Sequence, residues 1–258
     1  MALVYACLTW AFPSAGMAKG VTAFSNVWIV VAESAPADEF VVHPKEVVFK
    51  QRVLPTGAAQ IQSDYEGIDG KNAAQSGAQL IELRAEGKAI FCSTDMGHDF
   101  EYNNTWIGRK NRVRCFSDDD LDGDFDQSFW GYNSVKELPT LVGIIPDKLE
   151  QAVSIPYSRI NPNDFKQKYF VAVFFTGKSF IRGNLEFDIR YGEDGRWGYF
   201  NSPKISPGQI KSYPDIMTIM GSIISAKRAD ESSVRVKVLR MMPAQPFGIT
   251  VMKFTYFM

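Results

Sequence analysis

The sequence is poor in the residue types and patterns that would identify a zinc protein, a membrane-spanning protein or a nucleic-acid-binding protein. It contains only two histidines, His43 and His98, and three cysteines in 258 residues. Two histidines so far apart cannot assemble a His-rich zinc site. No stretch approaches about 18 uninterrupted apolar residues, which excludes a membrane-spanning helix. The 28 basic and 29 acidic residues nearly cancel, so the net charge provides no overall field for binding nucleic acid.

Strand patterns dominate what is present. After residue 38, short runs rich in Val, Ile, Phe and Tyr are separated by Gly-containing turns, and hairpin turns are expected at 85–88, 176–179 and 192–195. No alternation of strands with helices is visible, and a short helix is expected only over Asp215–Ile224, with one helical turn over Pro146–Gln151. The sequence therefore predicts a mainly β fold, an antiparallel β-sandwich of hairpin meanders with one or two short helices.

The N-terminal segment indicates export. Residues 1–18 carry no charge, are mostly apolar and end near the small residues Gly16 and Ala18, which is typical of a secretory signal peptide. No Lys or Arg precedes the apolar run, which an upstream start or a start at Met17 would explain. The alternative is that residues 1–31 supply a buried N-terminal strand, since Val27–Val31 has the composition of one. We expect a signal peptide at 1–18, a β region at 19–138 and a second β region at 139–258, in the same sandwich or separate. The expected location is the periplasm or the exterior of the cell.

The cysteines agree with export. Removal of residues 1–18 also removes Cys7 and leaves the even pair Cys92 and Cys115. In an oxidising compartment this pair would form a disulfide that closes a loop of about 24 residues and contributes roughly 3 kcal/mol. The alternative is two buried thiols in a reducing compartment.

The strongest local signal is an acidic loop, with six aspartates between residues 117 and 126. Its D-x-D-x-D-G pattern places aspartates at alternate positions, and Gly123 permits a sharp turn. A hard divalent cation such as Ca²⁺ takes six to eight oxygen ligands at about 2.3–2.6 Å, and a loop that turns around the ion supplies them. The predicted ligands are five aspartates of this loop: Asp118, Asp120, Asp122, Asp124 through its carbonyl, and Asp126.

The flanking sequence indicates which kind of calcium loop this is. An EF-hand would have a bidentate Glu where Phe129 stands, and no helix pattern flanks the loop. The loop instead resembles the D-x-D-x-D-G-x-x-D calcium loops held between two β-strands in the propellers of integrin α-subunits. This resemblance covers about a dozen residues in one copy and implies a calcium loop, not a propeller. A solvated acidic loop, a magnesium site and a catalytic carboxylate site are the alternatives. The matching residues are Asp118, Asp120, Asp122, Gly123 and Asp126.

Aromatic residues beside predicted turns suggest a ligand-binding surface. Trp106, Trp130 and Tyr132 could stack on a carbohydrate or another cell-surface ligand, although such rings commonly fill a core. We expect an exported calcium-binding β protein with a structural or ligand-binding role and no catalysis. The alternative is an extracellular carbohydrate-active hydrolase whose carboxylate pair comes from the segment between the cysteines. The carboxylates considered for that role are Asp95, Asp99 and Glu101.

Overall fold

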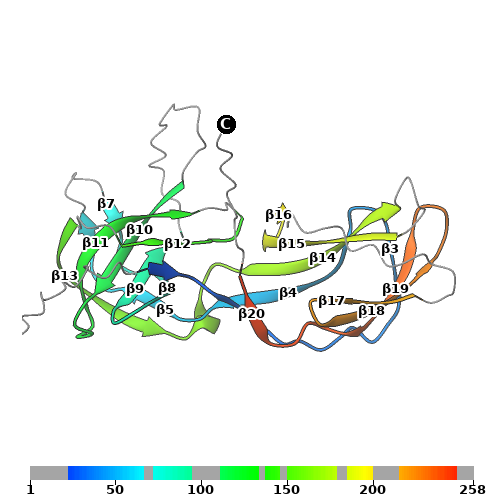
Figure 1. The fold of residues 1–258 in the computed structure, drawn as a ribbon, viewed down its shortest axis with the longest axis horizontal. Coiled ribbons are helices and arrows are strands. Elements are labelled where there is room, and N and C mark those ends of the chain that lie inside the picture. The colour runs from blue at the N-terminus through cyan, green and yellow to red at the C-terminus, as the bar shows by residue number, and fades with distance from the viewer. Residues whose placement is uncertain are drawn as a thin grey trace, which may run out of the picture.

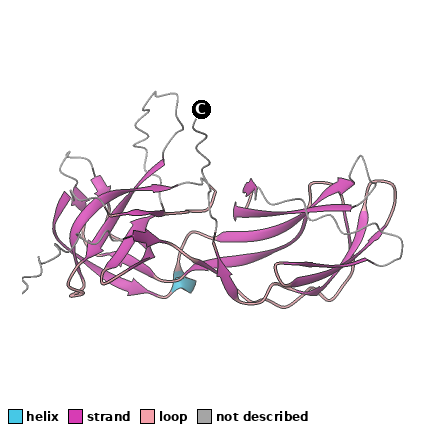
Figure 2. Ribbon diagram, in the orientation of Figure 1, coloured by secondary structure: helices cyan, strands magenta, loops and turns pink. Residues whose placement is uncertain are grey.

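The structure is a computed structural model of the chain, and it describes residues 23–66, 72–94, 111–133, 137–145, 150–178, 185–199 and 215–248. The expected signal peptide lies outside these residues. The described elements are antiparallel β-strands apart from a single turn of 3-10 helix, η1 (Pro162–Asp164) (Figure 2). The prediction of a mainly β, antiparallel fold is therefore confirmed.

A closed six-stranded barrel forms one end of the molecule (Figure 1). Its strand order is β8-β5-β13-β11-β10-β9, and pairing of β9 with β8 closes the ring. β1 (Ala23–Ser25) and β12 (Val142–Ile144) extend the sheet beyond β8, and β6 (Tyr65–Glu66) pairs separately with β7 (Asn72–Ala74). The barrel strands are β5 (Ala58–Ile61), β8 (Gln79–Ala85), β9 (Ala89–Ser93), β10 (Asn111–Asp118), β11 (Asp124–Asn133) and β13 (Glu150–Ile160).

Two further sheets form the other end, which is a β-sandwich (Figure 1). Their inner faces contribute to one hydrophobic core, with Val173 and Phe187 on one sheet and Ile224 and Val236 on the other. The six-stranded sheet runs β16 (Arg196–Tyr199), β15 (Leu185–Glu193), β14 (Tyr169–Lys178), β4 (Val47–Pro55), β2 (Trp28–Val30) and β20 (Gln245–Phe247). The four-stranded sheet runs β17 (Asp215–Ile219), β18 (Ser222–Arg228), β19 (Val234–Arg240) and β3 (Phe40–Val42).

The barrel and the sandwich share a hydrophobic core, and barrel strands that contribute to it are therefore buried on both faces. Along β9, Ala89 and Phe91 belong to a separate buried cluster, to which all six barrel strands contribute. The alternate residues Ile90 and Cys92 belong to the core shared with the sandwich. Both faces of β9 are therefore apolar, which explains its uninterrupted hydrophobic sequence.

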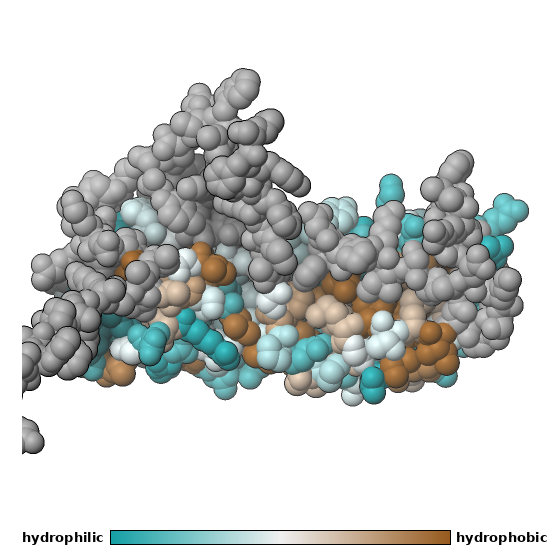
Figure 3. Space-filling model, viewed as in Figure 1, coloured by the Kyte–Doolittle hydropathy of each residue, from teal (hydrophilic) through white to brown (hydrophobic). Residues whose placement is uncertain are grey.

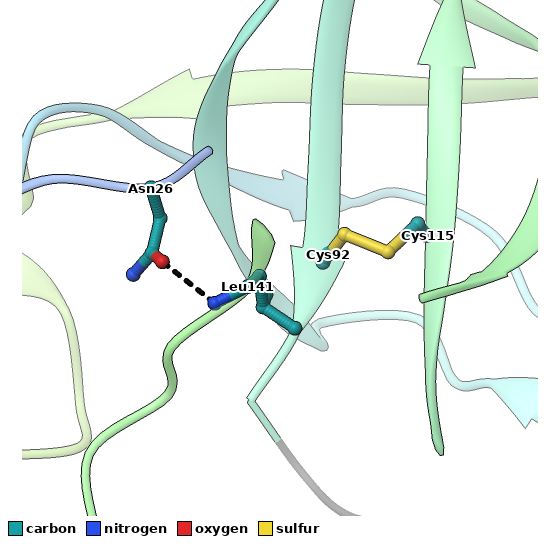
Figure 4. The surroundings of a disulfide bond; sticks show 4 residues. All are labelled: Asn26, Cys92, Cys115 and Leu141. Atoms are coloured by element: carbon teal, nitrogen blue, oxygen red, sulfur yellow. Dashed lines mark hydrogen bonds between the residues drawn. A yellow bond between two sulfur atoms is a disulfide. The ribbon is translucent and has the colours of Figure 1, made fainter. Parts of the chain in front are cut away.

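The predicted disulfide is present between neighbouring strands of the barrel. Cys92 of β9 and Cys115 of β10 lie opposite each other, with 4.0 Å between their Cα atoms, and both are fully buried. Figure 4 shows the bond beside Asn26, whose side-chain oxygen accepts a hydrogen bond from the Leu141 amide at 2.8 Å. Gly131 on β11 leaves room for the sulfur, because a Cβ there would lie 2.6 Å from the Cys115 Sγ.

Two of the three expected hairpins have the expected turns. β8 pairs with β9, and β15 pairs with β16. In the third, Thr176–Lys178 continues β14, which pairs with β15 beginning at Leu185, so the strand extends through the expected turn. Of the helical turn expected at 146–151, residues 146–149 lie outside the described residues and Glu150–Gln151 begin β13.

The prediction of a helix over Asp215–Ile224 is wrong. These residues form β17, a turn and the start of β18. Met217 and Ile219 are buried while Ile216 is exposed, which is the two-residue period of a strand. At the turn, Met220 and Gly221 have φ angles of 47° and 80°. Two successive residues with positive φ favour a tight hairpin turn and are incompatible with a right-handed helix.

Strand pairing crosses the division expected after residue 138. β13, which follows it, pairs with β11 and β5 in the barrel. β2 and β4, which precede it, pair with β20 and β14 in the sandwich. Both ends of the molecule are thus built from segments on the two sides of residue 138.

Gln51 links two parts of the sandwich through a buried amide, which leads to a first prediction. Its side chain accepts from the Met242 amide at 2.7 Å and donates to the carbonyls of Val31 at 2.9 Å and Met242 at 3.0 Å. Gln51→Leu is expected to lower the free energy of unfolding by about 2 kcal/mol, because these backbone groups lose their partner. Urea denaturation measures the loss. The exposed Gln62→Leu serves as control, and an equal loss in both variants would contradict this role.

Candidate metal centre

The acidic loop joins two hydrogen-bonded strands at one end of the barrel. β10 ends at Asp118, β11 begins at Asp124, and the paired residues Ser117 and Gln127 close the base of the loop. Asp118 is fully buried, whereas Leu121 at the tip is 63% exposed. The loop therefore reaches from the barrel interior into solvent.

The Asp118 carboxylate organises the backbone of this loop. One of its oxygens accepts a hydrogen bond from the Leu121 amide at 2.6 Å, and the other accepts from the Gly123 amide at 3.2 Å. Leu121 and Gly123 have φ angles of 64° and 98°, a region that Gly adopts readily and a branched side chain disfavours. The chain thus curls around Asp118.

Tyr157 of β13 connects this carboxylate to the barrel core. Its hydroxyl donates to the Asp118 Oδ2 at 2.7 Å, and its ring stacks on Phe125 with 4.3 Å between centroids. Desolvation by burial is the largest cause that raises the pKa of Tyr157, and the hydrogen bond to Asp118 and its negative charge raise that pKa further. The phenol therefore stays protonated and acts as a donor to the carboxylate.

Three aspartates of the loop come together. Asp118, Asp120 and Asp126 each offer a carboxylate oxygen, and these oxygens lie within 4.8 Å of one another. The pKa of Asp120 is raised, first by desolvation and next by the negative charge of Asp122. Carboxylate oxygens gathered in this way suit a hard divalent cation, which would offset their mutual repulsion. These residues could hold a metal ion.

The other aspartates of the loop make different contacts. Asp122 is exposed and accepts from the Asp124 amide at 2.9 Å, and the Asp124 carboxylate accepts from the Ser154 hydroxyl. Asp119 forms an ion pair with Lys88 at 2.9 Å. Three of the five predicted ligands thus form the cluster, and ion binding by Asp122 and by the Asp124 carbonyl stays a prediction. The sequence carried no signal for Tyr157, which lies 39 residues from Asp118.

The residues proposed for ligand binding are only partly described. Trp130 is half-buried, and its ring lies 3.9 Å from the guanidinium carbon of Arg114. One face of this ring is therefore already occupied. The backbone of Tyr132 pairs with Arg112 in the barrel. Trp106 and the carboxylates of the hydrolase alternative, Asp95, Asp99 and Glu101, lie outside the described residues.

Comparison of the chain with protein-family models, with curated proteins and with solved structures finds no match. Within the described residues, no helix has the length and apolar character needed to cross a membrane.

Proposed function

We propose that the chain is an exported calcium-binding β protein in which the ion has a structural and non-catalytic role. The observation that carries this proposal is the convergence of carboxylate oxygens from Asp118, Asp120 and Asp126 on the loop between β10 and β11. Calcium takes more oxygen ligands than these three side chains offer. Asp122, the Asp124 carbonyl and water would supply the others.

The contacts around the loop support a structural role. Besides its link to Tyr157, the loop accepts a hydrogen bond at its Gly123 carbonyl from the Tyr157 amide at 3.1 Å. Lys88, in the turn before β9, pairs with Asp119. An ion held by the loop would therefore stabilise the junction of β9, β10, β11 and β13. Its binding free energy would add directly to the stability of the barrel.

The disulfide supports the exported location. Cys92 and Cys115 are bonded and fully buried. Structural disulfides persist in oxidising environments such as the periplasm and the cell exterior. A location outside the cytosol also fits a structural calcium ion. Calcium-binding modules of extracellular proteins commonly bind the ion with modest affinity.

A thermal melt tests the proposed calcium site. With free Ca²⁺ about 100-fold above Kd, the bound ion is expected to add about 2.7 kcal/mol relative to chelator, a rise in Tm of roughly 5–10 °C. Asp120→Ala is expected to abolish the rise, because it removes one of the three converging carboxylates. Asp120 is exposed, and among the described residues its carboxylate accepts one hydrogen bond, from the Asp122 amide at 3.3 Å, so stability in chelator should change little.

Asp38→Ala is the matched control, since Asp38 is an exposed aspartate that precedes β3 of the four-stranded sheet and is not part of the acidic loop. It should keep the full calcium-dependent rise. An equal rise with Mg²⁺ would show a general divalent-cation site. A missing rise in the wild type, or a rise that survives in Asp120→Ala, would contradict calcium binding at this cluster.

A further inference from the structure

The outward face of the four-stranded sheet carries both basic and exposed aliphatic side chains. Along β19, Val234, Val236 and Val238 are buried, and the residues between them point outward. Such alternation assigns each side chain of the sheet to one face. By this register the outer face includes Val41, Ile216, Thr218, Ile223, Ser225, Lys227, Arg235 and Lys237, and the exposed Leu239 follows at the register shift of β19.

Strand register places the two kinds of side chain next to each other. Ile216 of β17 lies opposite Ser225 of β18, which lies opposite Lys237 of β19. In the adjoining row of the same face, Lys227 lies opposite Arg235, and Arg235 lies opposite Val41. The basic residues thus share one surface with the aliphatic residues.

The aliphatic side chains of this outer face are unusually accessible. Ile216 is 66% exposed, Leu239 46% and Val41 44%. Figure 3 shows hydrophobic side chains gathered where Figure 1 places β17 and β18. A single exposed aliphatic residue is ordinary, but several on one sheet face indicate an interaction surface.

The charge of the outer face is positive. Lys227 forms an ion pair with Glu39 at 3.3 Å. Within the part of the chain that the structure describes, no ion pair engages Arg235 or Lys237, and both are exposed. The whole chain has a net charge of only −1, so this positive character is local. A partner complementary to this face would be negatively charged.

We propose that this outer face docks on an anionic lipid surface. Arg235 and Lys237 would contact the anionic headgroups, and Ile216 and Leu239 would enter the apolar boundary beneath them. A water-soluble polyanion would match the charges but leave the aliphatic side chains in water. The two kinds of side chain together therefore favour lipid. This inference goes beyond calcium binding and is independent of it, because the acidic loop lies on the barrel and not on this sheet.

Vesicle flotation with the full chain tests the docking. We expect the protein to float with phosphatidylglycerol-containing phosphatidylcholine vesicles, to float less at high salt, and to bind pure phosphatidylcholine weakly. Each basic side chain near the surface should contribute about fivefold in partitioning, the equivalent of about 1 kcal/mol. Arg235→Glu/Lys237→Glu should therefore reduce partitioning by roughly 25-fold or more, and Ile216→Ser/Leu239→Ser by about tenfold.

Two exposed positions off the face provide controls, Lys166→Glu for the charge and Val142→Ser for the aliphatic contact. Both should float like the wild type, and circular dichroism should show that all variants are folded. Heparin serves as the soluble polyanion. Binding of heparin, together with wild-type flotation of Ile216→Ser/Leu239→Ser, would overturn lipid docking in favour of a polyanion site. Absence of flotation, equal binding to neutral vesicles, or equal losses in the controls would also overturn it.

Discussion

Asp118→Ala is expected to lower the free energy of unfolding by about 3 kcal/mol even when no calcium is present. The fully buried carboxylate accepts from the amides of Leu121 and Gly123 and from the Tyr157 hydroxyl. Truncation leaves these donors without their acceptor, at a cost of about 1–3 kcal/mol for each one that water does not reach. Relief of repulsion with Asp120 and Asp126 offsets this by only about 1 kcal/mol near the solvent. Urea denaturation in chelator measures the change.

Two variants separate the role of Asp118 from that of the loop in general. Asp122→Ala removes an exposed carboxylate that accepts one bond, from the Asp124 amide, and should cost less than about 1 kcal/mol. Tyr157→Phe removes only the hydroxyl that donates to Asp118 and should cost about 1–1.5 kcal/mol. If Asp118→Ala were as stable as Asp122→Ala in chelator, Asp118 would not organise the loop as the geometry indicates.

Removal of the disulfide is expected to have a comparable effect. Cys92→Ala/Cys115→Ala should lower the free energy of unfolding by about 3 kcal/mol, because the bond closes a loop with a sequence separation of 23 and restricts the unfolded chain. Alanine is preferred to serine because both sites are fully buried, and a hydroxyl there would lack a partner. Denaturation in urea with and without reductant measures the effect.

The wild type provides the control for this double variant. Reductant should destabilise the wild type to the level of Cys92→Ala/Cys115→Ala and should leave that variant unchanged. Since both sulfurs are buried, reduction is expected only as the protein unfolds. If the oxidised wild type and the double variant unfolded at the same urea concentration, the bond would not stabilise the barrel.

The disulfide and the Asp118 hydrogen bonds both hold β10 in place. The disulfide joins β10 to β9 through Cys115, and three residues later Asp118 joins the end of β10 to β13 through Tyr157. One contact is covalent and buried in the shared core, and the other lies at the barrel end where the metal ion would bind. An ion at the loop would therefore strengthen a strand that the disulfide already holds.

Features that depend on residues close together in the chain could be predicted from the amino-acid sequence. The alternation of Val234, Val236 and Val238 with polar residues defined β19 and its buried face. Gly87 and Gly195 marked two hairpin turns, and both have a positive φ, at 71° and 85°. The acidic loop was visible because its carboxylates are only two to four residues apart. The cysteine pair was visible because few cysteines are present.

Contacts between segments far apart in the sequence became apparent only in the folded chain. Pairing of β13 with β5 joins strands that lie far apart in the sequence and completes the barrel, and no local pattern encodes that partner. Tyr157 reaches Asp118 only because β13 lies beside β11 in the closed sheet. The largely apolar segment 215–224 is so short that its pattern fits both the helical and the strand period. Burial of alternate residues against the facing sheet selected the strand. Burial of hydrophobic side chains between segments far apart in the sequence therefore selected the secondary structure where local propensity favoured neither helix nor strand.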